Sequence, residues 1–294
     1  EIGLCLVGSE MCIRDSPAQF GKPFGQNAFS PSANVVGAQS YNFSFTYRGS
    51  ENTSNPQLVT SLTPIGIMNN GVVFFSPSAG VGQVPPGLDP TADAPGTNFE
   101  YNAVQFRTNY GGDDAGGWPE TTGQYHYMSG QFLNLPTGSS EANAGWQAST
   151  VTGASPAAAY YTASNFSGDY FRHADGHSKI LGYCFDGYPI YGPYGYSDYN
   201  DPTSVVVRMT SSYQYYSTEP TGRGYLYGAK TAGTFINDHE DQIGTGLLDE
   251  YNGRFEKTPE YVNGTYCYHV TVDSNLQPVY PYIVGPSTKQ QRAY

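Results

Sequence analysis

The sequence predicts an all-β, loop-rich protein with a sandwich- or barrel-like fold and little helix. Gly and Pro account for 36 and 21 of the 294 residues, and both interrupt helices. The 27 Tyr and 15 Phe residues favour strands and are numerous enough to cover a core. Several short runs also alternate aromatic and small polar residues, which is the period of a half-buried strand.

The charge balance excludes two classes of partner. The chain has 13 Lys and Arg against 25 Asp and Glu, for a formal net charge of −12. So few basic side chains do not suit nucleic acid, whose phosphates need cations, and we expect no nucleic-acid binding. The apolar runs are shorter than the ~18 residues of a membrane helix, so we expect no membrane span.

The two ends of the chain are expected to lie outside the folded domain. Residues 1–16, EIGLCLVGSEMCIRDS, resemble one reading frame of a translated sequencing adapter joined to a metagenomic gene, and we expect them to be unstructured. Residues 17–40 have the Pro, Ser, Ala and Gly content of a linker. Residues 287–294 are expected to be the tail of a truncated chain. The β domain is therefore predicted over residues 41–286.

Strands are expected in order from Tyr41, where YNFSFTYR alternates in the period of a strand. The segments IGIMNNGVVFF and LGYCFDGYPIYGP are predicted hairpins that turn at Asn70-Gly71 and Asp186-Gly187. We expect type I′ turns there, with positive φ at both central residues. Pro189 predicts that the return arm of the second hairpin lies at a sheet edge or a bulge.

Two further strands are expected near the end of the chain, in GTYCYHVTV and PVYPYIVGP. Helix is expected only as a turn or two within residues 154–166 and 238–250, where helix formers are locally more frequent.

The sequence also predicts an internal repeat, with halves at about 41–150 and 160–286. In the hairpins, Gly66, Asn70, Gly71, Phe75 and Pro77 match Gly182, Asp186, Gly187, Tyr191 and Pro193 at identical spacing. Downstream, PETTGQYHYM at 119–128 matches PEYVNGTYCYH at 259–269 with one insertion. Two similar β units about a pseudo-twofold would explain both matches.

The repeat singles out four side chains that suit a soft metal ion. Because strand side chains alternate, His126 and Met128 share one face, and Cys267 and His269 share one face of the other strand. If the two strands were neighbours, the four side chains would converge into a site for copper or zinc. Asp175 and Asp186 are candidates to orient the imidazoles. The alternative is core packing, with each His hydrogen-bonded to a carbonyl.

Catalysis has weaker support. His173 and His177 are four residues apart in HADGHS, but Asp175-Gly176 predicts a turn rather than the helix of a zinc protease. A hydrolase that uses His177 and Asp186 is therefore only the third hypothesis, and Asp186 is expected to cap its own hairpin. We do not expect an enzyme.

Two cysteines lie within the predicted β domain, Cys184 and Cys267. They form either a disulfide, which would stabilise the fold by ~4 kcal/mol, or two reduced thiols.

From about Pro64 to Pro286 the sequence resembles YHYH-domain proteins, named for a Tyr-His-Tyr-His run. The resemblance is carried by PIGIMNNGVVFF, PETTGQYHY, HSKILGYCFDGYPIYGP, LDEYNGRF, GTYCYHVTV and PVYPYIVGP. The positions that match the family motif are Tyr125, His126, Tyr127, His177, Asp186, Gly187, Tyr266 and Tyr268. The chain departs from the family at Met128, where the last His of the run is lost, and at Trp118, where the family often has His.

The resemblance implies a role more than an activity. The family occurs in bacteria and in marine and cyanobacterial phages, and the chain is most similar to the phage branch, which is thought to be virion-associated. We therefore expect an extracellular, non-enzymatic structural or adhesion module of a phage virion or a bacterial surface. Its expected partners are other virion or surface proteins, or glycans. The alternatives are a copper or zinc protein and then a hydrolase.

Overall fold

The computed structural model describes residues 2–7, 34, 36–37, 39–45, 56–59, 62–91, 93–95, 99–112, 116–131, 172–216, 232–290 and 292. The all-β prediction is confirmed, because every regular element in these ranges is a strand except the short 3₁₀ helix η5 (Ile236–Asp238). No helix in this part of the chain is long and apolar enough to cross a membrane.

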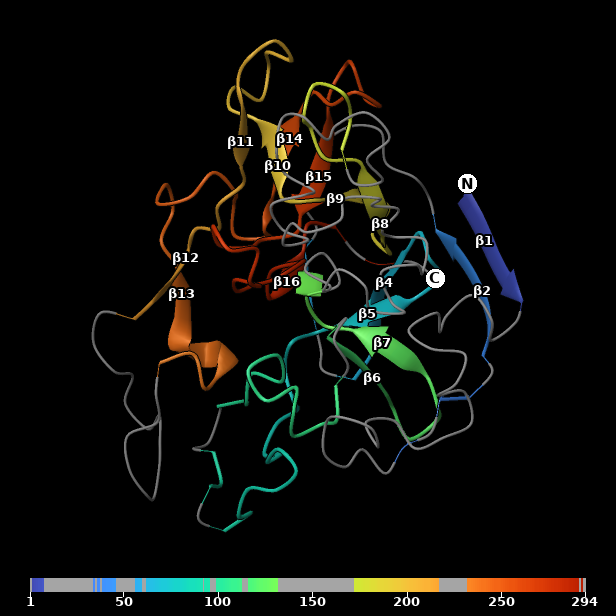
Figure 1. Ribbon diagram of the computed structural model, residues 1–294, viewed down its shortest axis with the longest axis vertical. Coiled ribbons are helices and arrows are strands. Elements are labelled where there is room, and N and C mark those ends of the chain that lie inside the picture. Colours follow the sequence, from blue (N-terminus) through green and yellow to red (C-terminus); the bar gives the residue numbers. More distant parts are fainter. Residues whose placement is uncertain are drawn as a thin grey trace, which may run out of the picture.

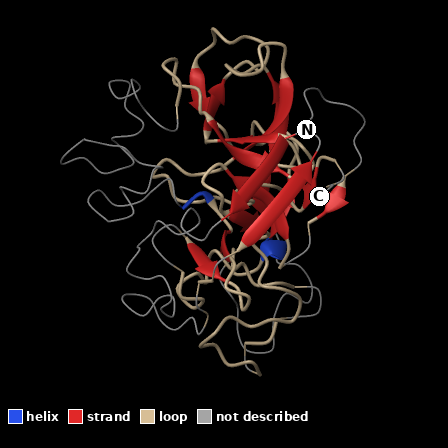
Figure 2. Ribbon diagram, turned by 90° about the vertical axis from the view of Figure 1, so that its right-hand side faces the viewer, coloured by secondary structure: helices blue, strands red, loops and turns tan. Residues whose placement is uncertain are grey.

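An eight-stranded mixed sheet forms the centre of the molecule. Its spatial order is β14 (Gly253–Glu256), β15 (Thr265–His269), β9 (Pro189–Tyr191), β8 (Ile180–Cys184), β4 (Pro64–Met68), β5 (Val73–Phe75), β7 (Tyr125–Tyr127) and β6 (Gly117–Pro119). The sheet runs from β14 in the upper part of Figure 1 down to β6, and long loops surround it (Figure 2). Two neighbouring pairs, β5–β7 and β9–β15, are parallel, and the other pairs are antiparallel.

Four two-stranded sheets flank the central one. They pair β1 (Ile2–Val7) with β2 (Ser40–Phe45), β3 (Gln57–Leu58) with β16 (Ser287–Thr288), β10 (Tyr194–Tyr196) with β11 (Val206–Arg208), and β12 (Tyr213–Tyr215) with β13 (His239–Asp241). All four pairs are antiparallel.

The ends of the chain differ from the expectation. Residues 2–7 were expected to be unstructured but form β1, whose apolar sequence is compatible with a strand and whose backbone pairs with the open edge of β2. Residues 287–288, expected to belong to a tail, form β16. The rest of residues 1–16 and most of the expected linker at 17–40 lie outside the described residues.

The two predicted hairpins are present, but their turns are of a different type. The Gly71 amide donates to Met68 O at 2.8 Å, and the Gly187 amide donates to Cys184 O at 2.9 Å. Only the glycines have positive φ, 87° and 94°, whereas Asn70 and Asp186 do not. A type I turn followed by a left-handed glycine has this pattern. The expected type I′ turn is therefore wrong, and the glycine alone supplies the unusual conformation.

Two smaller expectations hold only in part. Pro189 is not at a sheet edge, because β9 lies between β8 and β15, but the β8–β9 pair does contain the register shift of a bulge, which was the other alternative. Pro189 is the first residue of β9, and pairing with β15 begins only at Ile190, so its missing N–H is not needed there. Residues 238–250 contain β13 and turns, and only Asp238 belongs to η5. The other expected helix, at 154–166, falls outside the described ranges.

The strand pairing repeats between the two halves. On β4–β5, Gly66 pairs with Phe74 and Ile67 with Val73. On β8–β9 the same pairs recur 116 residues later, at Gly182 with Ile190 and Tyr183 with Pro189, including the register shift before the glycine. Each hairpin then adds a parallel strand and an outer antiparallel one, so that β4 and β8 meet at the middle of the sheet. Superposition of the halves about a pseudo-twofold stays a prediction.

The middle pair β4–β8 depends on two glycines. A Cβ at Gly182 would lie 2.4 Å from Ile67 O and 2.7 Å from Met68 Cα, and a Cβ at Gly66 would lie 2.3 Å from Tyr183 O. Side-chain atoms cannot approach backbone that closely, so the two strands pair only when these positions carry no side chain.

We therefore expect Gly182→Ala to destabilise the protein by about 3 kcal/mol, the upper end of the range for overpacking. Urea unfolding followed by circular dichroism measures this. Gly37→Ala is the matched control, since its nearest neighbours would lie at 3.7 Å or more. Equal stability of the two variants would contradict the close approach.

Candidate functional site

Strands β14 and β15 bring three metal-binding side chains together. Cys267 lies opposite Arg254 in the register, so that Glu256, Cys267 and His269 project from the same face of this pair. The Sγ of Cys267 lies 3.2 Å from Glu256 Oε1 and 3.7 Å from His269 Nε2, and the latter two atoms are 2.6 Å apart. All three side chains are fully buried. One thiol, one imidazole and one carboxylate therefore converge.

His177 supplies a fourth donor from the loop before β8. Its Nε2 lies 3.8 Å from Glu256 Oε1, is buried and has no hydrogen-bond partner among the residues that the structure describes. Its Nδ1 lies 2.7 Å from Ser178 O. A carbonyl only accepts, so Nδ1 is the donor in this bond, and Nε2 is the ring nitrogen that lies near Glu256.

His269 is oriented in the same way, because its Nδ1 donates to Gly192 O at 2.8 Å. The expected orienting groups, Asp175 and Asp186, lie elsewhere. Asp175 accepts from the Tyr196 hydroxyl and from the His177 amide. Backbone carbonyls thus replace the predicted carboxylates.

Arg254 balances the buried charge of Glu256. Its Nε donates to Glu256 Oε2 at 2.8 Å and its Nη2 also contacts Oε2, while Nη2 donates to Tyr196 O at 2.6 Å. Burial by itself would raise the pKa of Glu256, but the charge of His269, hydrogen bonds and Arg254 together hold that pKa well below its usual value. Glu256 is therefore a carboxylate, with Oε2 held by Arg254 and Oε1 directed into the cluster.

The Cys267 thiol is not arranged as a nucleophile. Burial and the neighbouring carboxylate of Glu256 raise its pKa well above the usual value, so the sulfur is protonated at neutral pH. Its exposed fraction is 0%. A reactive cysteine needs the opposite on both counts, a lowered pKa and access to substrate.

The structure separates the four predicted metal ligands into two pairs. Cys267 and His269 are on β15, but His126 and Met128 belong to β7 and the residue after it. Four strands, β9, β8, β4 and β5, lie between β15 and β7. The predicted convergence of all four side chains therefore does not hold, because matching positions in the repeat are far apart in the sheet.

Of the two alternatives for Cys184 and Cys267, the structure has two reduced thiols and no disulfide between them, since both are free. Cys184 is on β8, two strands from β15. At ~4.8 Å per strand, the two backbones are ~10 Å apart, beyond the ~7 Å limit for a disulfide.

The remaining motif residues are structural. Asp186 accepts from the Tyr268 hydroxyl at 2.5 Å and from the Tyr188 amide at 3.3 Å, so it caps its hairpin as expected and is not paired with His177. Tyr188, Tyr266 and Tyr268 pack edge-on, with ring centroids 5.0 to 6.5 Å apart. Tyr125 and Tyr127 form a similar edge-on pair.

Sequence reasoning missed Glu256 because it aligned the wrong glutamate. The repeat matched Glu120 with Glu260, but the strand register places Glu256 at the position of Glu120. Glu260 instead lies 2.7 Å from His173 Nε2 and accepts from the Tyr191 hydroxyl. In the sequence, Arg254 and Glu256 are two residues apart, as are Cys267 and His269. This spacing places both members of each pair on one face of a strand, and it was the signal that could have pointed to Glu256.

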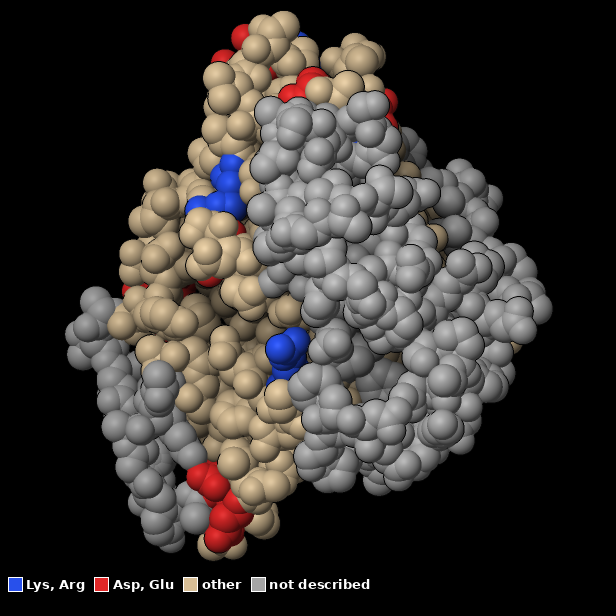
Figure 3. All heavy atoms as spheres, in the orientation of Figure 1, with Lys and Arg blue, Asp and Glu red and all other residues tan. Residues whose placement is uncertain are grey.

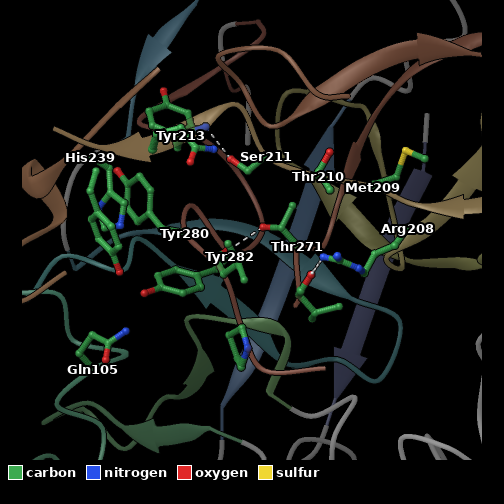
Figure 4. Close-up of a pocket in the computed structure, with 15 residues that line it drawn as sticks. Gln105, Arg208, Met209, Thr210, Ser211, Tyr213, His239, Thr271, Tyr280 and Tyr282 are labelled. Atoms are coloured by element: carbon green, nitrogen blue, oxygen red, sulfur yellow. Dashed lines mark hydrogen bonds between the residues drawn. The ribbon is translucent and has the colours of Figure 1, made fainter. Parts of the chain in front are cut away.

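A separate pocket of about 310 Å³ lies between β11, β12, β13 and residues 271–282. Figure 4 shows Tyr213, His239 and Tyr280 on one side and Arg208 on the other. The His239 ring stacks on Tyr280 at 4.1 Å and lies 4.7 Å from Tyr215. Arg208 donates to Val272 O at 2.6 Å. The pocket thus combines an aromatic wall with polar groups.

The fold and the cluster define an all-β protein with a buried group of a thiol, an imidazole and a carboxylate, side-chain types that can hold a metal ion. The YHYH protein family matches residues 42–280, most of the chain, and the chain belongs to that family. No curated protein and no solved structure matches it.

Removing the cation beside Glu256 is expected to be costly. We expect Arg254→Met to destabilise the protein by about 3 kcal/mol at pH 7, because it leaves a buried charge with one partner fewer. Urea unfolding measures the loss. Lys257→Met is the control, because no ion pair holds the Lys257 side chain in the structure described.

The loss of stability in Arg254→Met should depend on pH, because the pKa of Glu256 is lowered in the folded protein. A lowered folded-state pKa stabilises the fold above the ordinary glutamate pKa of ~4.3, and this stabilisation is lost as pH falls through the folded value. The loss in Arg254→Met should therefore shrink below about pH 4, and a constant loss would contradict the charge argument.

Proposed function

We propose that this chain binds one transition-metal ion, zinc in preference to copper, through Glu256, Cys267, His269 and His177. The observation that carries the proposal is the convergence of three different donor atoms, from Glu256, Cys267 and His269, in one fully buried place. His177 lies next to this group, with its Nε2 3.8 Å from Glu256 Oε1. A hydrogen-bonded charge cluster would not need a thiol beside a carboxylate, or an imidazole whose Nε2 has no partner.

The spacing of the donors supports a tetrahedral ion. Bonds of ~2.0–2.3 Å to zinc place neighbouring donors ~3.3–3.8 Å apart. The distances from Cys267 Sγ to Glu256 and His269, 3.2 and 3.7 Å, fall at or near this range, as does the 3.8 Å from His177 to Glu256. The 2.6 Å hydrogen bond between His269 and Glu256 must lengthen. The His177 side chain must also move toward Cys267 and His269, because it lies outside the group of three whose donor atoms are within 4.8 Å of one another. The pair of nitrogens, one sulfur and one oxygen suits zinc.

Both imidazoles are held in place by a carbonyl, to which each donates its Nδ1–H. In His269 the Nε2–H also donates to the Glu256 carboxylate at 2.6 Å, so this proton must leave when the ion binds. Because the Cys267 thiol must lose its proton on binding, metal affinity should fall as the pH is lowered.

The test is the metal content of the purified protein. We expect about one zinc per chain by mass spectrometry, falling to background in Cys267→Ala and in His269→Ala. The matched control is Cys184→Ala, the other buried free cysteine, which should keep its metal. His126→Ala should also keep it, because β7 is remote from the cluster.

Two outcomes would contradict the proposal. One is wild-type protein without stoichiometric zinc or copper after growth in medium supplied with both ions. The other is equal metal content in Cys267→Ala and Cys184→Ala. Either result would leave the cluster as a hydrogen-bonded core element.

A structural or adhesive role on a virion or a bacterial surface is a second proposal, compatible with the first. It is supported by the sparse charge on the part of the surface that Figure 3 describes and by exposed aromatic side chains such as Tyr199 and Tyr215. The pocket of Figure 4 gives it a specific feature, since aromatic rings beside polar groups suit a sugar ring. The partners would be glycans or neighbouring surface proteins.

We expect Tyr215→Ala to weaken binding on a glycan array about tenfold, because Tyr215 lines that pocket and lies against His239. Tyr199→Ala is the control, with a nearly equal exposed fraction, 51% against 52%, outside the pocket. Binding that the two substitutions weaken equally, or no glycan binding at all, would count against this role for the pocket.

A further inference from the structure

The first half of the chain has a carboxylate in the register position that Glu256 has in the second. On β6–β7, Trp118 lies opposite His126, just as Arg254 lies opposite Cys267 on β14–β15. Glu120 comes two residues after Trp118, and Glu256 comes two residues after Arg254. The two glutamates are therefore equivalent in the strand pairing.

Their charge partners are not equivalent. Glu256 has Arg254 and His269, but Trp118 and Met128 stand at the corresponding places of the first half. His126 is the nearest basic side chain to Glu120, with Nε2 3.7 Å from Oε1. Burial lowers the pKa of His126 to about 4, so the ring is neutral at pH 7.

Glu120 also has no other cation. Within the part of the chain that the structure describes, no Lys or Arg lies within 4.0 Å of its carboxylate. Its side chain is 25% exposed, so it is reachable from outside, unlike Glu256. Burial raises the pKa of Glu120, a cost that a bound cation would offset.

A pocket of about 480 Å³ lies beside this carboxylate. Glu120, Trp118, Tyr110 and Met128 line it with residues of the loops at 78–109. The rings of Tyr110 and Trp118 stack at 5.3 Å with an interplanar angle of 9°. A carboxylate among aromatic rings and a thioether is the environment that binds an organic ammonium group, since the ring faces and the charge both attract a cation.

We propose that this pocket binds a small organic cation whose ammonium group pairs with Glu120 and lies against the outer face of the stacked pair of Tyr110 and Trp118. The ligand supplies the positive charge that Arg254 supplies in the second half. The volume suits a molecule of several heavy atoms rather than a bare ion. This site is independent of the proposed metal centre, because β7 and β15 are separated by four strands.

Titration calorimetry with choline and n-butylammonium tests the proposal, with 3,3-dimethyl-1-butanol as the uncharged isostere of choline. We expect at least one cation to bind and the isostere to bind about tenfold more weakly. Binding should quench tryptophan fluorescence, since Trp118 lines the pocket.

Glu120→Gln should weaken cation binding about tenfold, and Glu120→Asp, which keeps the charge, should weaken it less. The control is Glu240→Gln on β13, outside the pocket. Thermal unfolding of each variant checks that the fold is kept.

The proposal would be overturned by no binding of either cation at millimolar concentration, by equal binding of the uncharged isostere, or by unchanged binding in a folded Glu120→Gln. Zinc that competes with choline and is lost in His126→Ala would also overturn it, in favour of a metal ion at Glu120 and His126. Metal content at Cys267 does not enter these outcomes, so the two proposals fail separately.

Discussion

The close contact of β4 and β8 is the constraint on which the rest of the structure depends. These strands join the two halves of one sheet, and their backbones approach at Gly66 and Gly182, where any side chain would collide with the opposite strand. Each hairpin then carries a parallel strand outward, β7 on one side and β15 on the other. The separation of His126 from Cys267 and His269 follows from that arrangement, because β7 and β15 lie on opposite sides of the β4–β8 pair.

The equivalent strand pairs β6–β7 and β14–β15 each place a glutamate in a buried or partly buried position, and they surround it with different side chains. Both place a glutamate where burial opposes its charge. The second half encloses Glu256 completely and neutralises it with Arg254 and imidazole, which also gathers metal-binding donors. The first half leaves Glu120 partly exposed beside an aromatic pocket. The same register therefore gives an enclosed, charge-paired glutamate in one place and a partly exposed glutamate beside a pocket in the other, and the two proposed sites rest on this difference.

Sequence reasoning predicted the local features and missed the long-range ones. The fold class, both hairpins and the shared face of Cys267 and His269 follow from alternation and turn residues, which are local. The separation of His126 from that pair depends on the order of eight strands, and a repeat cannot specify whether matching strands are neighbours. Glu256 was missed because the insertion between β14 and β15 let Glu260 align in its place. The free state of Cys184 likewise depends on strand order.

The place of β14 at the edge of the central sheet governs how the buried centre can exchange with solvent. Arg254 and Glu256 belong to this four-residue strand, which has only β15 as a neighbour in the sheet. Edge strands detach at a lower free-energy cost than the strands inside a sheet. Opening of β14 alone would carry a carboxylate and its guanidinium partner away and uncover the thiol and imidazole on β15. The lifetime of a bound ion would then be set by this local opening, and not by unfolding of the whole domain.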